Sequence, residues 1–315
     1  MIKFTFSQIE YVLAVHKHGH FGKAAESCRV TQPTLSMQIQ KLESDLAVAI
    51  FDRSKKPILL TEIGQKIVEH MQATMFEARK LNQAIESSKE KGLAGQLTLA
   101  VIPTLAPYIL PLLLPELEKM YPDVRLKIIE MQTQKIIGAL EQDEIDVGLL
   151  ATPLNVSSIH EHALFYEPFS VLVHKGHALS HVSRVKLDAL DTNDIWLLEE
   201  GHCLRNQVID VCAVKKKNLN RSKYQFESGS IETLKNLVDA YGGYTLVPAL
   251  ATNSVGAKSV LLPLERPIPA REIGLVYRRE HYKAELIEGL AEAIIKSLPE
   301  KIRKIRPKDL EVLPI

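Results

Sequence analysis

The sequence predicts an α/β protein with a small all-α module at its N-terminus. Residues 1–61 contain short stretches with helical apolar spacing, residues 62–91 contain one long helical pattern, and residues 92–315 alternate strand patterns with helical ones. Such alternation is typical of an α/β domain whose sheet is largely parallel. The length of 315 residues suits two domains with an appended module.

Composition excludes several classes of protein. The apolar fraction is 46 % and the net charge is +1, ordinary values for a soluble protein with a full core. The first residues lack a signal-peptide pattern, and the apolar runs are too short to span a bilayer. We therefore expect a cytoplasmic protein without a membrane partner. In the reducing cytoplasm, the three cysteines are not expected to form structural disulfides. Cys28 is expected to be a small buried side chain.

The first 46 residues carry helical patterns over 7–15, 21–28 and 30–46. In the third pattern Thr31 is a good N-cap, and Pro33 stands in the first turn, where its missing N–H has no cost. The buried stripe of this helix is expected to be Leu35, Ile39 and Leu42. Polar side chains off that stripe could enter a groove.

A basic turn follows this helix. The stretch 51–64 places Lys55-Lys56-Pro57 between two short strand patterns, which predicts a wing. Residues 1–66 hold nine Lys or Arg against six Asp or Glu, so this module has a net charge of +3. Modest local positive charge suits contact with phosphate groups.

Residues 62–91 form one long polar helical pattern without proline. The side chains at heptad spacing are Ile67, Met71, Thr74, Ala78, Leu81, Ile85 and Ser88. So narrow a stripe on so long a helix requires a partner, and we predict a linker helix that forms a homodimer. Packing of the helix on its own domain is the alternative.

Two successive sets of strands and helices follow. The first has strand patterns at 96–102, 124–131 and 145–151 and helical patterns at 108–120 and 134–141. The second has strand patterns at 168–175, 194–200, 224–228, 244–250, 260–265 and 272–278, a cysteine-containing segment at 203–212, and helical patterns at 231–240 and 283–298. Two half-domains of this kind predict a cleft between them.

The stretch FGKAAESCRVTQPTLSMQIQKLE resembles the winged helix-turn-helix of LysR-type transcriptional regulators, and FDR followed by LLTEIG fits the family's wing and linker start. The resemblance extends over the whole chain. It implies a DNA-binding domain at 1–61, a dimerisation helix at 62–91 and, at 92–315, a periplasmic-binding-protein-like effector domain of two α/β subdomains. It also implies a homotetramer on double-stranded promoter DNA that acts with RNA polymerase.

The same resemblance implies which residues contact DNA. The side chains facing the major groove would be Thr31, Gln32, Pro33, Ser36, Gln38 and Lys41. From the wing, Arg53, Lys55 and Lys56 would contact phosphate or the minor groove, unless they form an ordinary solvated face.

Within the family, GHCLRNQ followed by Cys212, SIETLKNLV and TLVPALA resemble the members that sense hydrogen peroxide. This implies that peroxide oxidises Cys203 to a sulfenic acid, that Cys212 resolves it as a disulfide, and that expression of oxidative-stress genes is switched. The implied peroxide pocket consists of Thr104, Thr133, His202, Arg205 and Arg271. We expect no cofactor and no metal ion, because no cofactor loop is recognisable.

The residues around Cys203 support this chemistry independently. A cysteine reacts as its thiolate, which positive surroundings or a helix N-terminus stabilise. Gly201 is a natural place for a helix to begin, and His202 and Arg205 flank the thiol. An intact helix would separate Cys203 and Cys212 by about 13.5 Å along its axis, beyond the roughly 4.4–6.8 Å between Cα atoms that a disulfide allows. Forming that disulfide must therefore remodel the segment.

Ordinary structural roles remain open for these residues. Thr104 could cap the following helix, Thr133 could be an N-cap, Arg271 could lie solvated at a strand edge, and Cys212 could be a buried core thiol. Two other functions also remain open. One is a LysR-type regulator that binds a small metabolite in the cleft. The other is a thiol peroxidase or disulfide reductase, against which the lack of a CxxC motif argues.

Overall fold

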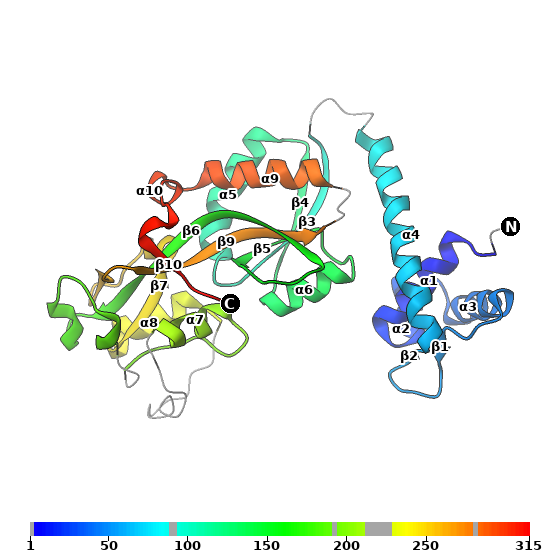
Figure 1. Cartoon of the computed structure of the whole chain (residues 1–315), viewed down its shortest axis with the longest axis horizontal. Helices are drawn as coiled ribbons and strands as arrows, with labels where there is room; N and C mark the ends of the chain where they lie inside the picture. The colour runs from blue at the N-terminus through cyan, green and yellow to red at the C-terminus, as the bar shows by residue number, and fades with distance from the viewer. Residues whose placement is uncertain (1–2, 88–92, 191–193, 212–228, 280–282) are drawn as a thin grey trace. The chain divides into compact units, whose positions relative to one another are not determined.

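The structure, a computed structural model, describes residues 3–87, 93–190, 194–211, 229–279 and 283–315 (Figure 1). The chain divides into two compact units, Met1–Lys89 and Glu90–Ile315. Among the residues just given, no helix is both long enough and apolar enough to cross a bilayer.

The first unit is the expected helical module. Its elements are α1 (Phe6–His18), α2 (Phe21–Ser27), α3 (Gln32–Leu46), β1 (Phe51–Asp52), β2 (Leu59–Leu60) and α4 (Glu62–Ser87). The Thr31 hydroxyl accepts a hydrogen bond from the backbone N–H of Thr34 and caps α3, as predicted. The predicted stripe on α3 is fully buried: Leu35, Ile39 and Leu42. The basic turn joins the antiparallel strands β1 and β2, which confirms the predicted wing.

Helix α4 has a buried part and an exposed part. Val68 and Met71 are buried in the core of the first unit, so the alternative of packing on its own domain holds for this stretch. Leu81 and Ile85, further along the predicted heptad stripe, are 64 % and 47 % exposed. Intra-unit packing therefore accounts for only the first part of the helix. Positions 88–91 of the predicted helix lie outside the described residues.

The second unit is built on a mixed sheet. Its strands are β3 (Gly95–Val101), β4 (Val124–Glu130), β5 (Val147–Thr152), β6 (Ile159–His174), β7 (Tyr244–Pro248), β8 (Ser259–Pro263), β9 (Ile268–Arg278) and β10 (Leu310–Val312). Their order is β4-β3-β5-β9-β6-β7, with β8 beside β6 and β10 beside β9. Short 3-10 turns are Ala178–His181, Leu187–Ala189, Ala249–Asn253 and Pro307–Asp309.

The predicted parallel pairing is confirmed for the strand patterns at 96–102, 124–131 and 145–151, but it does not extend to the rest of the unit. Strand β3 pairs in parallel with β4 and β5, but β9 is antiparallel to β5 and β6, and β6 is antiparallel to β7 and β8. The reason is that β6 and β9, 16 and 11 residues long, carry the chain from one core to the other and back. The predicted strand at 194–200 forms only a bridge from Ile195 to Tyr244. The predicted strand at 224–228 lies outside the described residues.

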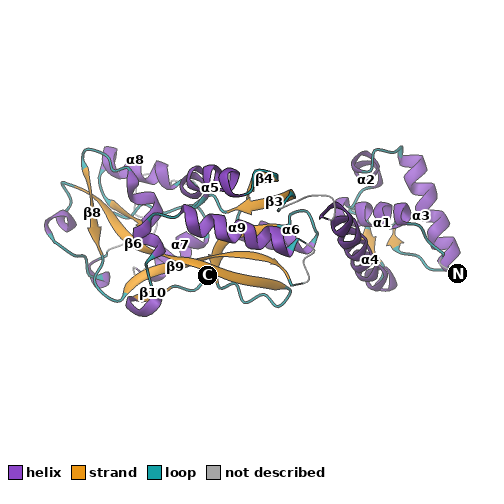
Figure 2. Cartoon of the chain, turned by 90° about the horizontal axis from the view of Figure 1, so that it is seen from above, coloured by secondary structure: helices purple, strands orange, loops and turns teal. Residues whose placement is uncertain are grey.

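Two hydrophobic cores correspond to the two expected subdomains. The first contains residues of α5 (Ala106–Met120), α6 (Thr133–Glu141) and α9 (Ala284–Ser297), packed on β3 and β5. The second contains residues of α7 (Cys203–Val211) and α8 (Ile231–Tyr241), packed on β7 and the later part of β6. Helices α5 and α9 lie side by side (Figure 2), and the short α10 (Glu300–Arg303) follows α9.

Candidate functional site

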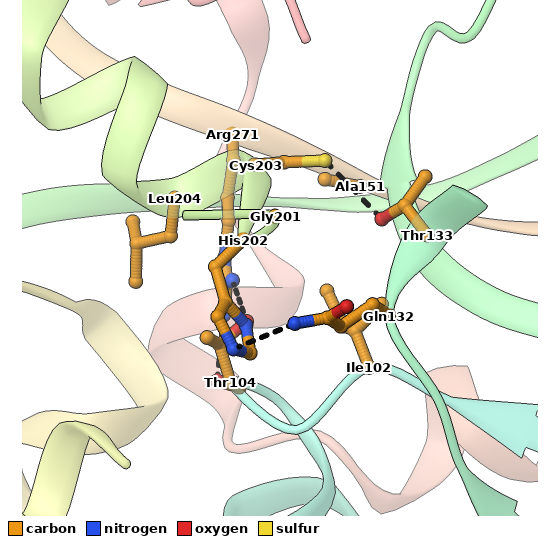
Figure 3. A pocket seen from close by; sticks show the side chains of 10 residues that line it. All are labelled: Ile102, Thr104, Gln132, Thr133, Ala151, Gly201, His202, Cys203, Leu204 and Arg271. Carbon is orange, nitrogen blue, oxygen red and sulfur yellow. Dashed lines mark hydrogen bonds between the residues drawn. The ribbon is translucent and has the colours of Figure 1, made fainter. Parts of the chain in front are cut away.

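Cys203 begins α7 and faces the N-terminal end of α6 (Figure 3). Its Sγ donates a hydrogen bond of 3.2 Å to Oγ1 of Thr133, the first residue of α6. Gly201, just before the helix, has a φ of +93°, a conformation that glycine adopts without strain. This turn directs the half-buried thiol towards the N-terminal end of a second helix.

Arg271 is buried and hydrogen-bonded, so the alternative of a solvated strand edge is wrong for it. The side chain is 1 % exposed, and its Nη2 lies 2.7 Å from Oε2 of Glu167, which is 0 % exposed. The guanidinium also donates to the hydroxyl of Thr104 at 3.0 Å and to the carbonyl of Thr104 at 3.2 Å. Thr104 therefore does not cap α5, whose N-cap is Leu105. The ion pair fixes the Thr104 hydroxyl instead.

The imidazole of His202 lies close to two other side chains of the site. The residue is buried, and its Nε2 lies 3.4 Å from Oε1 of Glu199 and 3.5 Å from Nε2 of Gln132. A Cβ atom on Gly229 would lie only 2.6 Å from the same ring nitrogen, so any other residue at this position would displace the imidazole. Gln132, rather than Thr133, is the N-cap residue of α6.

These side chains enclose a small pocket beside the thiol (Figure 3). Its lining residues are Ile102, Thr104, Gln132, Thr133, Ala151, Gly201, His202, Cys203, Leu204 and Arg271. The space has room for about one molecule of the size of water. Four of the five predicted pocket residues thus meet Cys203 in one place, although they come from separate segments.

Two predicted site residues are not found in this pocket. The Nη1 atom of Arg205 donates to the carbonyl of Leu198 at 2.6 Å, and the side chain lines a neighbouring hollow with Trp196. This contact ties α7 to the segment that precedes it. Cys212 lies outside the described residues, and α7 is described as far as Val211.

Three residues of the site had no role in the sequence-based prediction: Gln132, Glu167 and Glu199. Gln132 could not have been found, because glutamine is not a typical N-cap residue and the local signal pointed to Thr133 instead. Glu167 could not either, because its partner Arg271 lies 104 positions away in the sequence. Glu199 precedes the helix that carries the thiol, where an acidic residue is usually only a solvated side chain.

In the first unit, the side chains predicted to contact DNA lie along α3 and the wing. On α3 and at its N-cap, the exposed residues are Thr31, Gln32, Pro33 and Lys41, and the half-buried ones are Ser36 and Gln38. Lys55 and Lys56 are exposed in the turn between β1 and β2. Arg53 is exposed as well, with its Nη2 2.7 Å from Oε2 of Glu43 and its guanidinium carbon 5.2 Å from the ring centre of Phe21. These contacts link the wing to α2 and α3, and Arg53 and the two lysines all present exposed positive charge.

The helix-turn-helix unit and the separate α/β unit together define a DNA-binding regulator with an effector domain. Residues 6–65 match the bacterial regulatory helix-turn-helix proteins of the lysR family, and residues 90–299 match the LysR substrate binding domain. The chain belongs to the LysR family of transcriptional regulators. These regulators bind DNA and are not enzymes, so the alternative of a thiol peroxidase or disulfide reductase is wrong.

Similar proteins match nearly the whole chain. A hydrogen peroxide-inducible genes activator of Haemophilus influenzae is 33 % identical over 302 residues, 94 % of this chain and 98 % of the relative. The solved full-length OxyR of Pseudomonas aeruginosa, a cysteine-to-aspartate mutant, is 30 % identical, with a TM-score of 0.76 over 98 % of this chain and 100 % of that one. A hydrogen-peroxide-bound cysteine-to-serine mutant of Corynebacterium glutamicum OxyR is 29 % identical, with a TM-score of 0.60 over 94 % and 93 % of the two chains.

Proposed function

We propose that this chain regulates transcription in response to hydrogen peroxide, which oxidises Cys203. The observation that carries the proposal is the pocket at the thiol, which has room for about one water-sized molecule among hydroxyl, imidazole and guanidinium groups. Similarity to proteins described as peroxide-inducible activators supports it. A metabolite of many atoms does not fit beside Cys203, which disfavours the metabolite-binding alternative at this pocket.

In the first proposed step, the thiolate of Cys203 attacks one oxygen of hydrogen peroxide. An S–O bond forms and the O–O bond breaks, which gives a sulfenic acid and a hydroxide that takes up a proton to become water. The hydroxyl of Thr133, 3.2 Å from the sulfur, and the hydroxyl of Thr104, held by Arg271, would orient the peroxide. The N-terminal ends of α6 and α7 favour negative charge on the attacking sulfur and on the departing oxygen.

In the second proposed step, the thiol of Cys212 attacks the sulfenic sulfur. An S–S bond forms, the S–O bond breaks, and the hydroxide leaves as water after taking the thiol proton. Helix α7 rises about 12 Å from Cys203 to Val211, and the next Cα atom is about 3.8 Å further along the chain. The two cysteine Cα atoms cannot come within the roughly 6.8 Å of a disulfide while this helix persists. Opening of α7 is therefore the proposed switch.

The proposed working form is a homotetramer on promoter DNA in the cytoplasm, acting with RNA polymerase. Dimerisation through α4 is supported by the exposed Leu81 and Ile85 on its heptad stripe. In this arrangement, opening of α7 would change how effector domains pack and thereby how the regulator engages its promoter.

Trapping the sulfenic acid tests the proposed function. In a Cys212→Ser variant the resolving thiol is absent, so stoichiometric peroxide with dimedone should give an adduct at Cys203, detected by mass spectrometry. Cys28 is the internal control. Burial raises the pKa of its thiol, against a hydrogen bond with Ser27 that lowers it, so little thiolate should be present at neutral pH. Absence of an adduct at Cys203, or equal labelling of both cysteines, would contradict the proposal.

Replacing Lys55 and Lys56 together with alanine should weaken DNA binding at every DNA sequence. Both side chains are exposed in the wing turn, and each lost phosphate contact should lower the slope of log affinity against log salt by about 1. Fluorescence anisotropy over a salt series measures this slope. Lys66→Ala, an exposed lysine of α4 outside the wing, is the control. An unchanged slope in the double variant would mean that the wing lysines do not touch phosphate.

A further inference from the structure

A short segment after α10 packs against the helix that carries the thiol. We name residues 310–314 the strap. Its strand β10 pairs in parallel with Ile268–Ala270, the part of β9 directly before Arg271. The backbone N–H of Leu313 extends this pairing with a 2.9 Å hydrogen bond to the carbonyl of Ala270. The strap is therefore anchored to the strand that supplies the arginine of the pocket.

The strap reaches α7 by two kinds of contact. Leu313 is buried in the same hydrophobic core as Val208 of α7. Gln207 of α7 is 0 % exposed, and its Nε2 donates to the carbonyls of Leu313 at 3.4 Å and Pro314 at 3.3 Å. Figure 1 shows the red end of the chain running from β10 towards α7. The strap thus links β9 to the helix of the sensor thiol.

Gln207 also carries a feature that favours opening. Its Oε1 is buried without a hydrogen-bond partner among the described residues. A buried carbonyl oxygen without a partner is unfavourable, and water would satisfy it once α7 opened. The same side chain therefore holds α7 closed through its amide nitrogen and gains a partner for its oxygen when the helix opens.

We propose that the strap controls how readily α7 opens, and so controls the rate of disulfide formation after Cys203 has been oxidised. The inference rests on the proposed function, because it assigns a control to the same pair of cysteines. Gln207 and Leu313 do not line the pocket beside the thiol. Changes to the strap should therefore alter the second step of oxidation and leave the first step nearly unchanged.

A chain that ends at Val312 tests the strap. It keeps β10 but lacks Leu313 and both carbonyl acceptors of Gln207. We expect the Cys203–Cys212 disulfide to form about fivefold faster than in the full chain, with an unchanged rate of dimedone trapping in the Cys212→Ser background. A chain that ends at Pro314 is the matched control, because it keeps all these contacts, and it should behave like the full chain.

Gln207→Ala gives an independent test that leaves the strap in place. It should also accelerate disulfide formation. Combined with the chain ending at Val312, it should add little, because both changes remove the same contact. Full additivity of the two effects would overturn a control that acts through Gln207.

Hydrogen–deuterium exchange of the reduced protein separates failure of the strap from failure of peroxide sensing. Amides of α7 should exchange faster in the chain ending at Val312 and in Gln207→Ala, whereas amides of α5 should not change. Unchanged exchange in α7 together with an unchanged disulfide rate would overturn the strap alone. Peroxide that oxidises neither cysteine in any variant would overturn the proposed function and, with it, the redox role of the strap.

Discussion

Replacing Cys203 with serine should abolish the response to hydrogen peroxide. Serine is close in size and keeps a hydrogen-bonding group towards Thr133, but its hydroxyl does not form the oxidised species that a thiolate does. Because no sulfenic acid forms, α7 should stay closed. Transcription in vitro from a promoter that the protein binds should lose its dependence on peroxide, while DNA binding itself should remain.

Cys28→Ser is the matched control for this experiment, since Cys28 belongs to the first unit and its thiol is half-buried. It should keep the full response. If Cys203→Ser responds to peroxide like the parent protein, the cysteine is incidental. That result would favour the alternative of a LysR-type regulator that responds to a small metabolite bound in the cleft.

Arg271→Met should have the largest effect on stability. Arg271 and Glu167 are 1 % and 0 % exposed, so loss of the arginine leaves a buried carboxylate without its partner. We expect the free energy of unfolding of the second unit to fall by about 3–5 kcal/mol. Urea denaturation of the reduced protein measures it. Arg266→Met is the control, because its pair with Asp309 is exposed, and its effect should be below about 1 kcal/mol.

A double variant separates the structural role of Arg271 from its chemical role. Glu167→Gln in the Arg271→Met background removes the unpaired charge and keeps an acceptor for the backbone N–H of Leu250. Most of the lost stability should return. Oxidation of Cys203 should stay about 100-fold slower than in the parent, because the pocket lacks the guanidinium that stabilises the departing oxygen. Recovery of both properties would mean that Arg271 is only structural.

Local signals in the sequence predicted the first unit well. Thr31, Pro33 and the stripe of α3 are close together in the chain, so an N-cap, a first-turn proline and helical spacing were enough. The direction of pairing in the sheet was not predictable in this way. It depends on β6 pairing with β9 across about a hundred residues, and alternation of strands and helices does not encode that pairing.

Local signals in the sequence do not predict which residues meet in the candidate site either. Thr104, Thr133 and Arg271 come from separate segments, and only the family resemblance brought them together before the structure was known. Arg205, by contrast, was predicted to line the pocket and does not. It stands two positions after Cys203 in a helix, and residues two positions apart do not share a helix face. Closeness in sequence therefore suggested a pocket residue where the fold directs the side chain to Leu198.

The most direct test is peptide mapping of the full chain under non-reducing conditions after titration with hydrogen peroxide. The account predicts a Cys203–Cys212 cross-linked peptide that increases with peroxide, is absent in Cys203→Ser, and disappears after reduction. If both thiols remain reduced in an excess of peroxide, oxidation of Cys203 is not the signal to which this regulator responds.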